Sequence, residues 1–379
     1  MSDEAIYKGL IEWLNQAWFK LPEADELIPF LKARYTPEEA EFLTGMPFVT
    51  KTLDELAEMK QMDPAELGPK LDAMARKGLV WRRVKNGRTG YRLNDTFTAL
   101  RTAFWPGGTD EASMKLAPLT NKYYYNGWWD QWGDVHRKGL RTVPIHQTVE
   151  DTRKVLPFED VVKIVNDREY WSVSYCNCRH RKNIDPDSPD CKYPDRVCLH
   201  FDRLGHYIVE NGLGWEITRE ETIEILRESA EAGLVHGASN WDDNVDTICN
   251  CCKCCCIWLE AYHKLDHGKS LDPSNYRASV DAGKCKGCGL CVKRCPMEAL
   301  HLEESPEANN KAGKVAVLDR DLCIGCGVCA YKCPGDALVL EQIEEIVEPP
   351  KNAREYAMLY MADQHAAQAR REQEQAGDA

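Results

Sequence analysis

Cysteine dominates the chemistry that this sequence could perform. The chain has 379 residues and 18 cysteines, and all of them lie between Cys176 and Cys333. Thiolates are the ligands of zinc, copper(I) and iron–sulfur clusters. A disulfide scaffold is a poor explanation, because such scaffolds are small secreted domains with cysteines along their whole length. The cysteines therefore predict metal binding.

The most specific pattern is an internal repeat near the C-terminus. Residues 285–296 read CKGCGLCVKRCP and residues 323–334 read CIGCGVCAYKCP. Both fit C-x2-C-x2-C-x3-C-P, and in both an acidic residue followed by Ala-Leu comes shortly afterwards. Thiolates at this spacing on a tight loop can reach one metal cluster, and the glycines let the backbone wrap closely around it. The repeat predicts a pair of related metal sites.

This repeat resembles the bacterial two-cluster ferredoxin over about residues 278–342. The resemblance implies two [4Fe-4S] clusters, with the fourth cysteine of each run binding the cluster of the other run. One cluster is then expected on Cys285, Cys288, Cys291 and Cys333. The other is expected on Cys323, Cys326, Cys329 and Cys295. Zinc is a weak alternative, because two zinc sites would not need this doubled run with its paired prolines.

Ten further cysteines form a central group that is also predicted to bind metal: Cys176, Cys178, Cys191, Cys198, Cys249, Cys251, Cys252, Cys254, Cys255 and Cys256. Adjacent side chains of the CNCCKCCC run diverge in an extended loop, so this run is predicted to serve two sites or to leave some thiols free. Ten thiolates suffice for two more [4Fe-4S] clusters, which would make four in all. Zinc at one four-cysteine site and one large non-cubane cluster remain alternatives.

The arrangement over residues 140–345 is similar to a group of iron–sulfur proteins of anaerobic bacteria that end in a two-cluster ferredoxin module. Only Cys198-Leu199-His200 resembles half of a Rieske motif, so a Rieske centre is not expected. The nearby histidines are expected at the surface or beside the metal ligands, and these are His180, His200, His206 and His236. Arg179 and Arg181 either donate hydrogen bonds to a cluster or lie in solvent.

The surrounding elements predict an α+β multidomain protein. Helix starts at Thr36, Thr52 and Asp63, followed by an Asn86-Gly87 hairpin signal, resemble a winged helix-turn-helix domain. A further capped helix is predicted from Thr218 to Gly233. We predict N-terminal helices, a winged-helix-like domain, a central cysteine-rich Fe–S domain, a two-cluster ferredoxin domain and a helical tail, at residues 1–35, 36–105, 106–275, 276–345 and 346–379.

Charge and hydropathy restrict the partners. The chain has 48 basic and 61 acidic residues and a net charge of −13, which opposes general binding to nucleic acid or to an anionic membrane. Asp63 and Glu66 begin the helix that would enter a DNA groove, whereas residues 79–93 are basic. DNA binding is therefore not expected, and protein docking or a structural role is favoured. No apolar run of 18 residues and no secretory signal are present, so a cytoplasmic protein without a membrane helix is expected.

Several motifs of enzymes are absent from the sequence. It has no G-x-G-x-x-G before a helix, no Walker A loop, no G-x-S-x-G and no H-E-x-x-H. No catalytic acid–base residue is predicted. The sequence therefore predicts an electron-transfer protein or subunit of anaerobic metabolism, whose redox partner is a flavoprotein or low-potential reductase. The alternatives are a redox-sensing winged-helix regulator and a reductase with an open iron in its central cluster.

Overall fold

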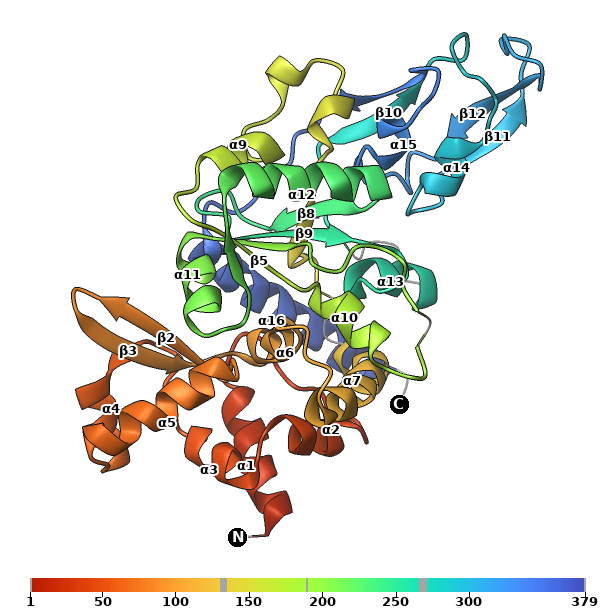
Figure 1. The fold of residues 1–379 in the computed structure, drawn as a ribbon. Coiled ribbons are helices and arrows are strands. Elements are labelled where there is room, and N and C mark those ends of the chain that lie inside the picture. Colours follow the sequence, from red (N-terminus) through yellow and green to blue (C-terminus); the bar gives the residue numbers. More distant parts are fainter. Residues whose placement is uncertain (1, 130–134, 189, 266–270, 378–379) are drawn as a thin grey trace.

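The computed structural model describes residues 2–129, 135–188, 190–265 and 271–377 (Figure 1). Its N-terminal part is helical, as expected for residues 1–35. It begins with α1 (Asp3–Leu14) and α2 (Leu27–Arg34) and continues, after the hairpin region, with α6 (Thr96–Phe104), α7 (Glu111–Tyr123) and the π-helical turn η1 (Tyr124–Trp128). Phe30 stacks on Tyr123 with ring centroids 5.3 Å apart, which ties α2 to α7.

Residues 36–95 form three short helices and a small sheet. The elements are α3 (Pro37–Leu43), β1 (Lys51–Thr52), α4 (Leu53–Lys60), α5 (Pro64–Arg76), β2 (Val80–Lys85) and β3 (Arg88–Leu93). Thr36 and Thr52 each close a capping box, and Asp63 caps α5, so the predicted helix starts are confirmed. Asn86 and Gly87 have φ values of 52° and 73° and turn the chain between β2 and β3. The element order is the one expected, and the winged-helix class stays a prediction.

The central part is built on a six-stranded antiparallel sheet in the order β4-β8-β9-β6-β5-β7. Its strands are β4 (Leu140–Thr142), β5 (Trp171–Ser174), β6 (Cys198–Phe201), β7 (Trp215–Ile217), β8 (Val235–Ser239) and β9 (Thr247–Cys251). Helices α9 (Val161–Asn166) and α12 (Arg219–Ala232) share an apolar core with β5, β6 and β9. Helices α10 (Asn177–Asn183), α11 (Asp202–Glu210) and α13 (Ile257–Lys264) complete this part, with short turns at His146–Thr148 and Thr152–Lys154. The predicted helix from Thr218 to Gly233 is confirmed.

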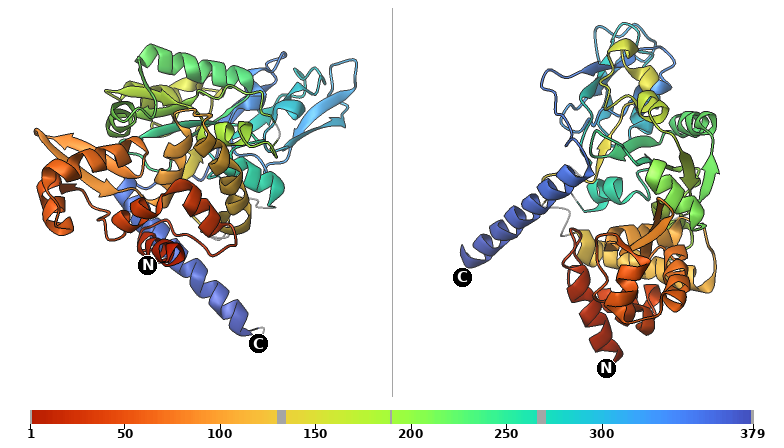
Figure 2. Two further views of the ribbon diagram at one scale, coloured as in Figure 1. Left: turned by 60° about the horizontal axis from the view of Figure 1, so that its bottom comes forward. Right: turned by 90° about the vertical axis from the view of Figure 1, so that its left-hand side faces the viewer.

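The C-terminal part contains two similar halves. Strand β10 (Tyr276–Val280) pairs with β13 (Leu338–Gln342), and β11 (Leu300–Glu304) pairs with β12 (Lys314–Leu318). Each cysteine run is followed by a short helix, which is α14 (Leu290–Arg294) in the first half and α15 (Val328–Tyr331) in the second. The long helix α16 (Ala353–Gly377) then extends away from the body of the molecule (Figure 2). Among the described helices, none is long and apolar enough to cross a membrane.

The parts are joined by specific contacts. Trp81 of β2 stacks on Tyr207 of α11, with ring centroids 4.2 Å apart. The Glu159 carboxylate accepts a 2.9 Å hydrogen bond from the Asn275 backbone N–H immediately before β10. An ion pair of 2.8 Å between Arg137 and Asp363 holds α16 against the chain near β4.

Candidate metal centres

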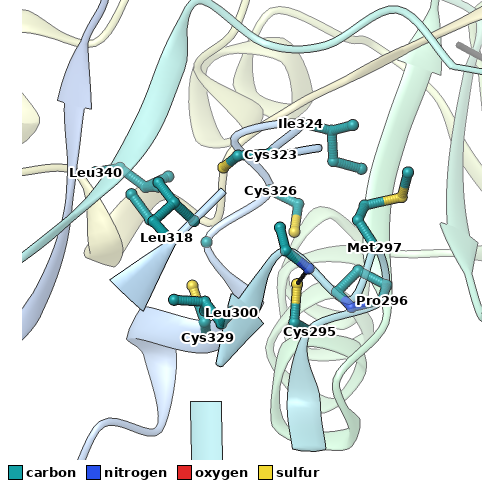
Figure 3. A pocket seen from close by; sticks show the side chains of 13 residues that line it. Cys295, Pro296, Met297, Leu300, Leu318, Cys323, Ile324, Cys326, Cys329 and Leu340 are labelled. Carbon is teal, nitrogen blue, oxygen red and sulfur yellow. Dashed lines mark hydrogen bonds between the residues drawn. The ribbon is translucent and has the colours of Figure 1, made fainter. Parts of the chain in front are cut away.

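The first candidate centre lies in the C-terminal part and combines both cysteine runs. Cys323, Cys326 and Cys329 line one apolar pocket together with Cys295, which comes from the other run (Figure 3). The pocket also contains Leu300, Leu318 and Leu340. The Cys295 Sγ accepts a 3.3 Å hydrogen bond from the Ala299 backbone N–H. Burial raises the pKa values of Cys326 and Cys329, so these thiols stay protonated unless a bound metal compensates the thiolate charge.

The second candidate centre repeats this arrangement. Cys285, Cys288 and Cys291 line a pocket with Cys333, the last cysteine of the opposite run. The Cys333 Sγ accepts a 3.3 Å hydrogen bond from the Ala337 backbone N–H, as Cys295 does in the other half. Burial raises the pKa of Cys291 to about 11, whereas Cys288 is exposed to solvent. Two sets of four thiols in apolar pockets fit [4Fe-4S] clusters, and the crossed pairing of residues is the one that the resemblance implies.

Four of the ten central cysteines converge on one point. The Sγ atoms of Cys191, Cys252, Cys254 and Cys255 all lie within 4.8 Å of one another. The Cys191 Sγ is 3.3 Å from the Cys254 Sγ and 3.9 Å from the Cys252 Sγ. Three of these residues come from the turn that links β9 to α13, and Cys191 comes from the loop after α10. Hydrogen bonds from the thiols of Cys252, Cys254 and Cys255 hold the pKa of Cys191 well below its usual range.

The spacing of this four-cysteine group carries information about its metal. A tetrahedral ion with metal–sulfur bonds of about 2.3 Å separates its thiolates by about 3.8 Å. The thiolates of a cubane bind four different iron atoms and lie further apart. The observed separations therefore match a single ion more closely than a cluster.

The six remaining central cysteines line a separate cavity of about 300 Å³: Cys176, Cys178, Cys198, Cys249, Cys251 and Cys256. Hydrogen bonds from Cys198 and Cys251 hold the pKa of Cys249 well below its usual range. A hydrogen bond from Cys178 lowers the pKa of Cys176 to about 6. These mutual contacts show that the thiols are close neighbours, and a set of buried and partly buried thiols around a cavity fits a polynuclear iron–sulfur centre.

Arg179 and Arg181 lie beside the thiols and are buried. The alternative expectation, that they lie in solvent, is therefore wrong. Arg179 is fully buried and Arg181 is 4% exposed. The Arg179 guanidinium donates a 3.1 Å hydrogen bond to the Asn250 carbonyl and also bonds the Cys252 thiol, so it lies between the four-cysteine group and Cys176. Burial acts to lower the pKa of Arg179, but the neighbouring cysteines outweigh it and raise that pKa above its usual range. Arg179 therefore compensates thiolate charge.

None of the four histidines belongs to the four-cysteine group. His180, His200 and His236 are buried and hydrogen bond Gly108, Ser174 and Asn250 at 2.9, 2.9 and 2.7 Å. The remaining one, His206, is exposed and stacks on Tyr170. Of the four, His200 also hydrogen bonds a cysteine, Cys198, which lines the cavity. Three of the histidines are thus buried and not at the surface, and His200 takes the other expected position, beside a predicted metal ligand. Their polar groups are satisfied by buried partners.

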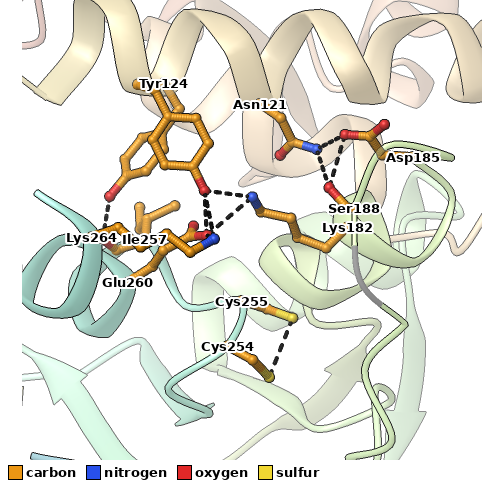
Figure 4. A network of polar contacts seen from close by, with 11 residues as sticks. Asn121, Tyr124, Lys182, Asp185, Ser188, Cys254, Cys255, Ile257, Glu260 and Lys264 are labelled. Atoms are coloured by element: carbon orange, nitrogen blue, oxygen red, sulfur yellow. Dashed lines mark hydrogen bonds and ion pairs between the residues drawn. The ribbon is translucent and has the colours of Figure 1, made fainter.

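A buried polar network fixes the helices that follow the central cysteines. The Glu260 carboxylate of α13 lies 3.1 Å from the Lys182 ammonium of α10 and 2.6 Å from the Lys264 ammonium (Figure 4). The Tyr125 hydroxyl donates to Glu260, and the Tyr124 hydroxyl donates to the Ile257 carbonyl. Since α10 begins after Cys176 and α13 begins after Cys256, this network sets the positions of the thiols.

Part of the cavity lining was not predicted from the sequence. It consists of aromatic and basic side chains, among them Phe97, Arg101 and Trp105. Their spacing of four residues places them on one face of α6 and its C-terminal end. That spacing was visible in the sequence, but nothing local indicated that this face meets the cysteines.

Comparison with known proteins supports the C-terminal centres. Residues 284–337 match the family described as the 4Fe-4S dicluster domain, and this range holds both cysteine runs. No curated protein matches the chain. A dicluster domain implies two [4Fe-4S] clusters, and the four-cysteine group adds a site for a further cluster or metal. The chain is therefore an iron–sulfur redox protein.

Proposed function

We propose that this chain is an electron-transfer protein that relays electrons between its ferredoxin pair and a third iron–sulfur centre in the central cavity. When bound, [4Fe-4S] clusters supply one-electron oxidation and reduction at potentials set by their surroundings. The single observation that carries the proposal is the adjacency of the thiol sets. Apart from Cys198 and Cys288, the cysteines of the ferredoxin pair and of the cavity belong to one connected cluster of buried and partly buried side chains.

Helix α13 forms the link between the two regions. It starts directly after Cys256, which lines the cavity. At its other end, His263 Nε2 lies 2.6 Å from the carbonyl oxygen of Pro296, the residue after Cys295. His263 comes seven positions after Cys256, which is about 10 Å along the helix axis. The chain thus holds the two sets of thiols at a short, fixed separation within packed protein.

The ferredoxin pair reaches the protein surface at the cluster site that contains Cys288. Cys288 is exposed, and its neighbours Lys284, Lys286 and Leu290 are exposed as well. We propose that the redox partner, a flavoprotein or low-potential reductase, docks here with an acidic rim. The basic residues would steer this partner towards a chain whose overall charge is −13.

We assign the four-cysteine group to one structural zinc ion rather than to a fourth cluster, because its sulfur atoms are so close together. The three neighbouring cysteines 252, 254 and 255 and the distant Cys191 would then be clamped together by the metal. This clamp joins the loop after α10 to the turn before α13.

The N-terminal domain is proposed to have a docking and structural role instead of reading DNA. Arg82 is a basic residue of its hairpin. The Arg82 guanidinium lies 2.9 Å from the carboxylate of Asp72 in α5 and 3.3 Å from the carboxylate of Glu210 in the central part. Asp63 occupies the N-cap of α5 and would face a DNA phosphate with negative charge. The hairpin is thus already engaged with α11 within the chain.

Electron relay is tested by anaerobic EPR of the intact protein during stepwise reduction. The account predicts three paramagnetic centres, with the third broadened by magnetic interaction with the ferredoxin pair. Cys249→Ala should remove the third signal and leave the other two. The matched control, Cys191→Ala, should leave all three signals and lose zinc. Two signals in the native chain would reject the relay.

A further inference from the structure

The cavity that the six cysteines line is also lined by residues of different chemistry. Helix α6 contributes Phe97, Arg101 and Trp105 to it, β3 contributes Arg92, and α11 contributes Arg203. These residues come from both sides of the junction between the N-terminal and central parts. The lining of the cavity therefore contains both thiols and guanidinium groups.

The three guanidinium groups have acidic neighbours but no close ion pair, since Asp246 lies near Arg101 and Arg203, and Asp95 lies near Arg92. Within the described residues, Arg92, Arg101 and Arg203 make no ion pair, and the one hydrogen bond among them runs from Arg92 to the Leu93 carbonyl at 3.5 Å. Asp246 is the one carboxyl group among the described lining residues, and its Oδ1 accepts a 2.8 Å hydrogen bond from Ser239. Among the described lining residues, three guanidinium groups thus stand against one carboxyl group.

Arg101 and the other two arginines occupy different positions. Arg101 lies close enough to Cys249 and Cys198 for their charges to raise its pKa, against the effect of burial, which lowers it. Arg101 can therefore balance the charge of the thiols. Arg203 is exposed to solvent, and Arg92 lies near it, so these two stand at the mouth of the cavity. Their guanidinium groups are the ones left to bind a ligand.

The lining is also flat and aromatic. The Arg92 guanidinium lies 4.9 Å from the centroid of the Trp81 ring, and the Arg101 guanidinium lies 5.2 Å from that of Trp105. Trp18 and Trp258 add further aromatic surface. Planar walls of this kind pack well against a planar apolar ligand.

We propose that this cavity is the binding site of a small planar carboxylate, such as an aromatic acid. Its carboxylate would be held by Arg92 and Arg203, and its ring would lie between the tryptophans with one edge towards the cysteine wall. The planar fork of a guanidinium group matches a carboxylate, which it can hold through two parallel hydrogen bonds. The volume of about 300 Å³ must also hold the proposed third centre, which leaves room for one ring and not for a nucleotide.

This inference rests on the proposed function in one respect: the third centre would occupy the cysteine wall and give the ligand a redox neighbour. The binding itself is tested by isothermal titration of the iron-replete full chain without oxygen. Benzoate, its neutral analogue benzamide, and inorganic phosphate serve as probes. We expect saturable binding of benzoate, at least about tenfold weaker binding of benzamide, and no binding of phosphate at similar concentrations, because both a charge and a flat body are needed.

Three double variants separate the ligand site from general electrostatics. Arg92→Met with Arg203→Met should weaken benzoate binding at least about tenfold, and lysine at both positions should give an intermediate loss, because the charge remains but the fork is lost. The matched control, Lys85→Met with Arg88→Met, removes two exposed basic residues of the β2–β3 hairpin that contains Arg92. It should leave benzoate binding unchanged. Circular dichroism and iron content verify that each variant is folded.

The inference is overturned if iron-replete protein binds no benzoate, if benzamide or phosphate binds equally well, or if the Arg92 and Arg203 variants bind as the native chain does. The proposed function fails differently. Benzoate binding that survives in a protein with only the iron of the ferredoxin pair would uphold the ligand site and reject the third centre.

Discussion

Replacing Gly325, in the cysteine run 323–334, by alanine should lower the stability of the protein far more than the same change at Gly313. Both glycines have left-handed backbone, with φ values of 69° and 61°. A side chain therefore costs about 1–2 kcal/mol of backbone strain at either position. The surroundings differ, because a Cβ at Gly325 would lie 2.2 Å from the Tyr276 carbonyl oxygen and 2.2 Å from the Ser274 Oγ, whereas a Cβ at Gly313 meets nothing within 4 Å.

The clash at Gly325 cannot be relieved by a side-chain rotation alone. Tyr276 is the first residue of β10, and it pairs with Gln342 of β13. Moving its carbonyl oxygen would strain the sheet that supports the loop. Overpacking of this kind adds about 1–3 kcal/mol, so the total for Gly325→Ala is about 2–5 kcal/mol, compared with about 1–2 kcal/mol for Gly313→Ala.

Anaerobic urea unfolding, followed by circular dichroism and by the visible absorption of the clusters, measures the difference. Gly325→Ala should unfold at clearly lower urea than Gly313→Ala, and its cluster absorption should decrease first because Cys326 directly follows the altered residue. Equal midpoints for the two variants, with equal iron contents, would refute the packing argument.

Three other changes test separate parts of the structure. Serine at both Cys295 and Cys323 should leave one intact [4Fe-4S] signal in the ferredoxin pair, because both residues line one pocket, and loss of both signals from a folded variant would reject the crossed arrangement. Lys182→Met should lower the free energy of unfolding by about 2 kcal/mol, since it leaves the Glu260 carboxylate buried with fewer partners, and a change below 0.5 kcal/mol in urea unfolding would contradict this. Burial raises the pKa of Glu159 to about 7 despite its hydrogen bonds, so the native chain should lose up to about 3 kcal/mol of stability relative to Glu159→Gln as the pH rises from about 4.5 to 7, and parallel pH profiles would show that this carboxyl group titrates normally.

The local features of the fold were predictable from the sequence. Helix starts at Thr36, Thr52 and Thr218 follow from capping boxes, in which side chains three residues apart satisfy free backbone groups. The hairpin at Asn86-Gly87 follows from residues that tolerate positive φ. The ferredoxin repeat was equally readable, because its spacing is set by the metal site itself.

The division of the central cysteines was not predictable in the same way. Cys191 meets the turn at 252–255 only because α10 and α13 pack together through buried groups such as Lys182 and Glu260. Such contacts join residues about 60–80 positions apart, and no local pattern encodes them. For the same reason the sequence could not show that Arg179 is buried or that the face of α6 with Arg101 closes the cavity.

We expect the cysteines between the N-terminal domain and the ferredoxin pair to hold a third redox centre in addition to one zinc ion. Metal analysis of anaerobically purified protein tests this most directly, with iron and zinc counted per chain. The account predicts about twelve irons and one zinc, from three four-iron clusters and the four-cysteine group. About eight irons per chain, with no EPR signal besides those of the ferredoxin pair, would contradict it.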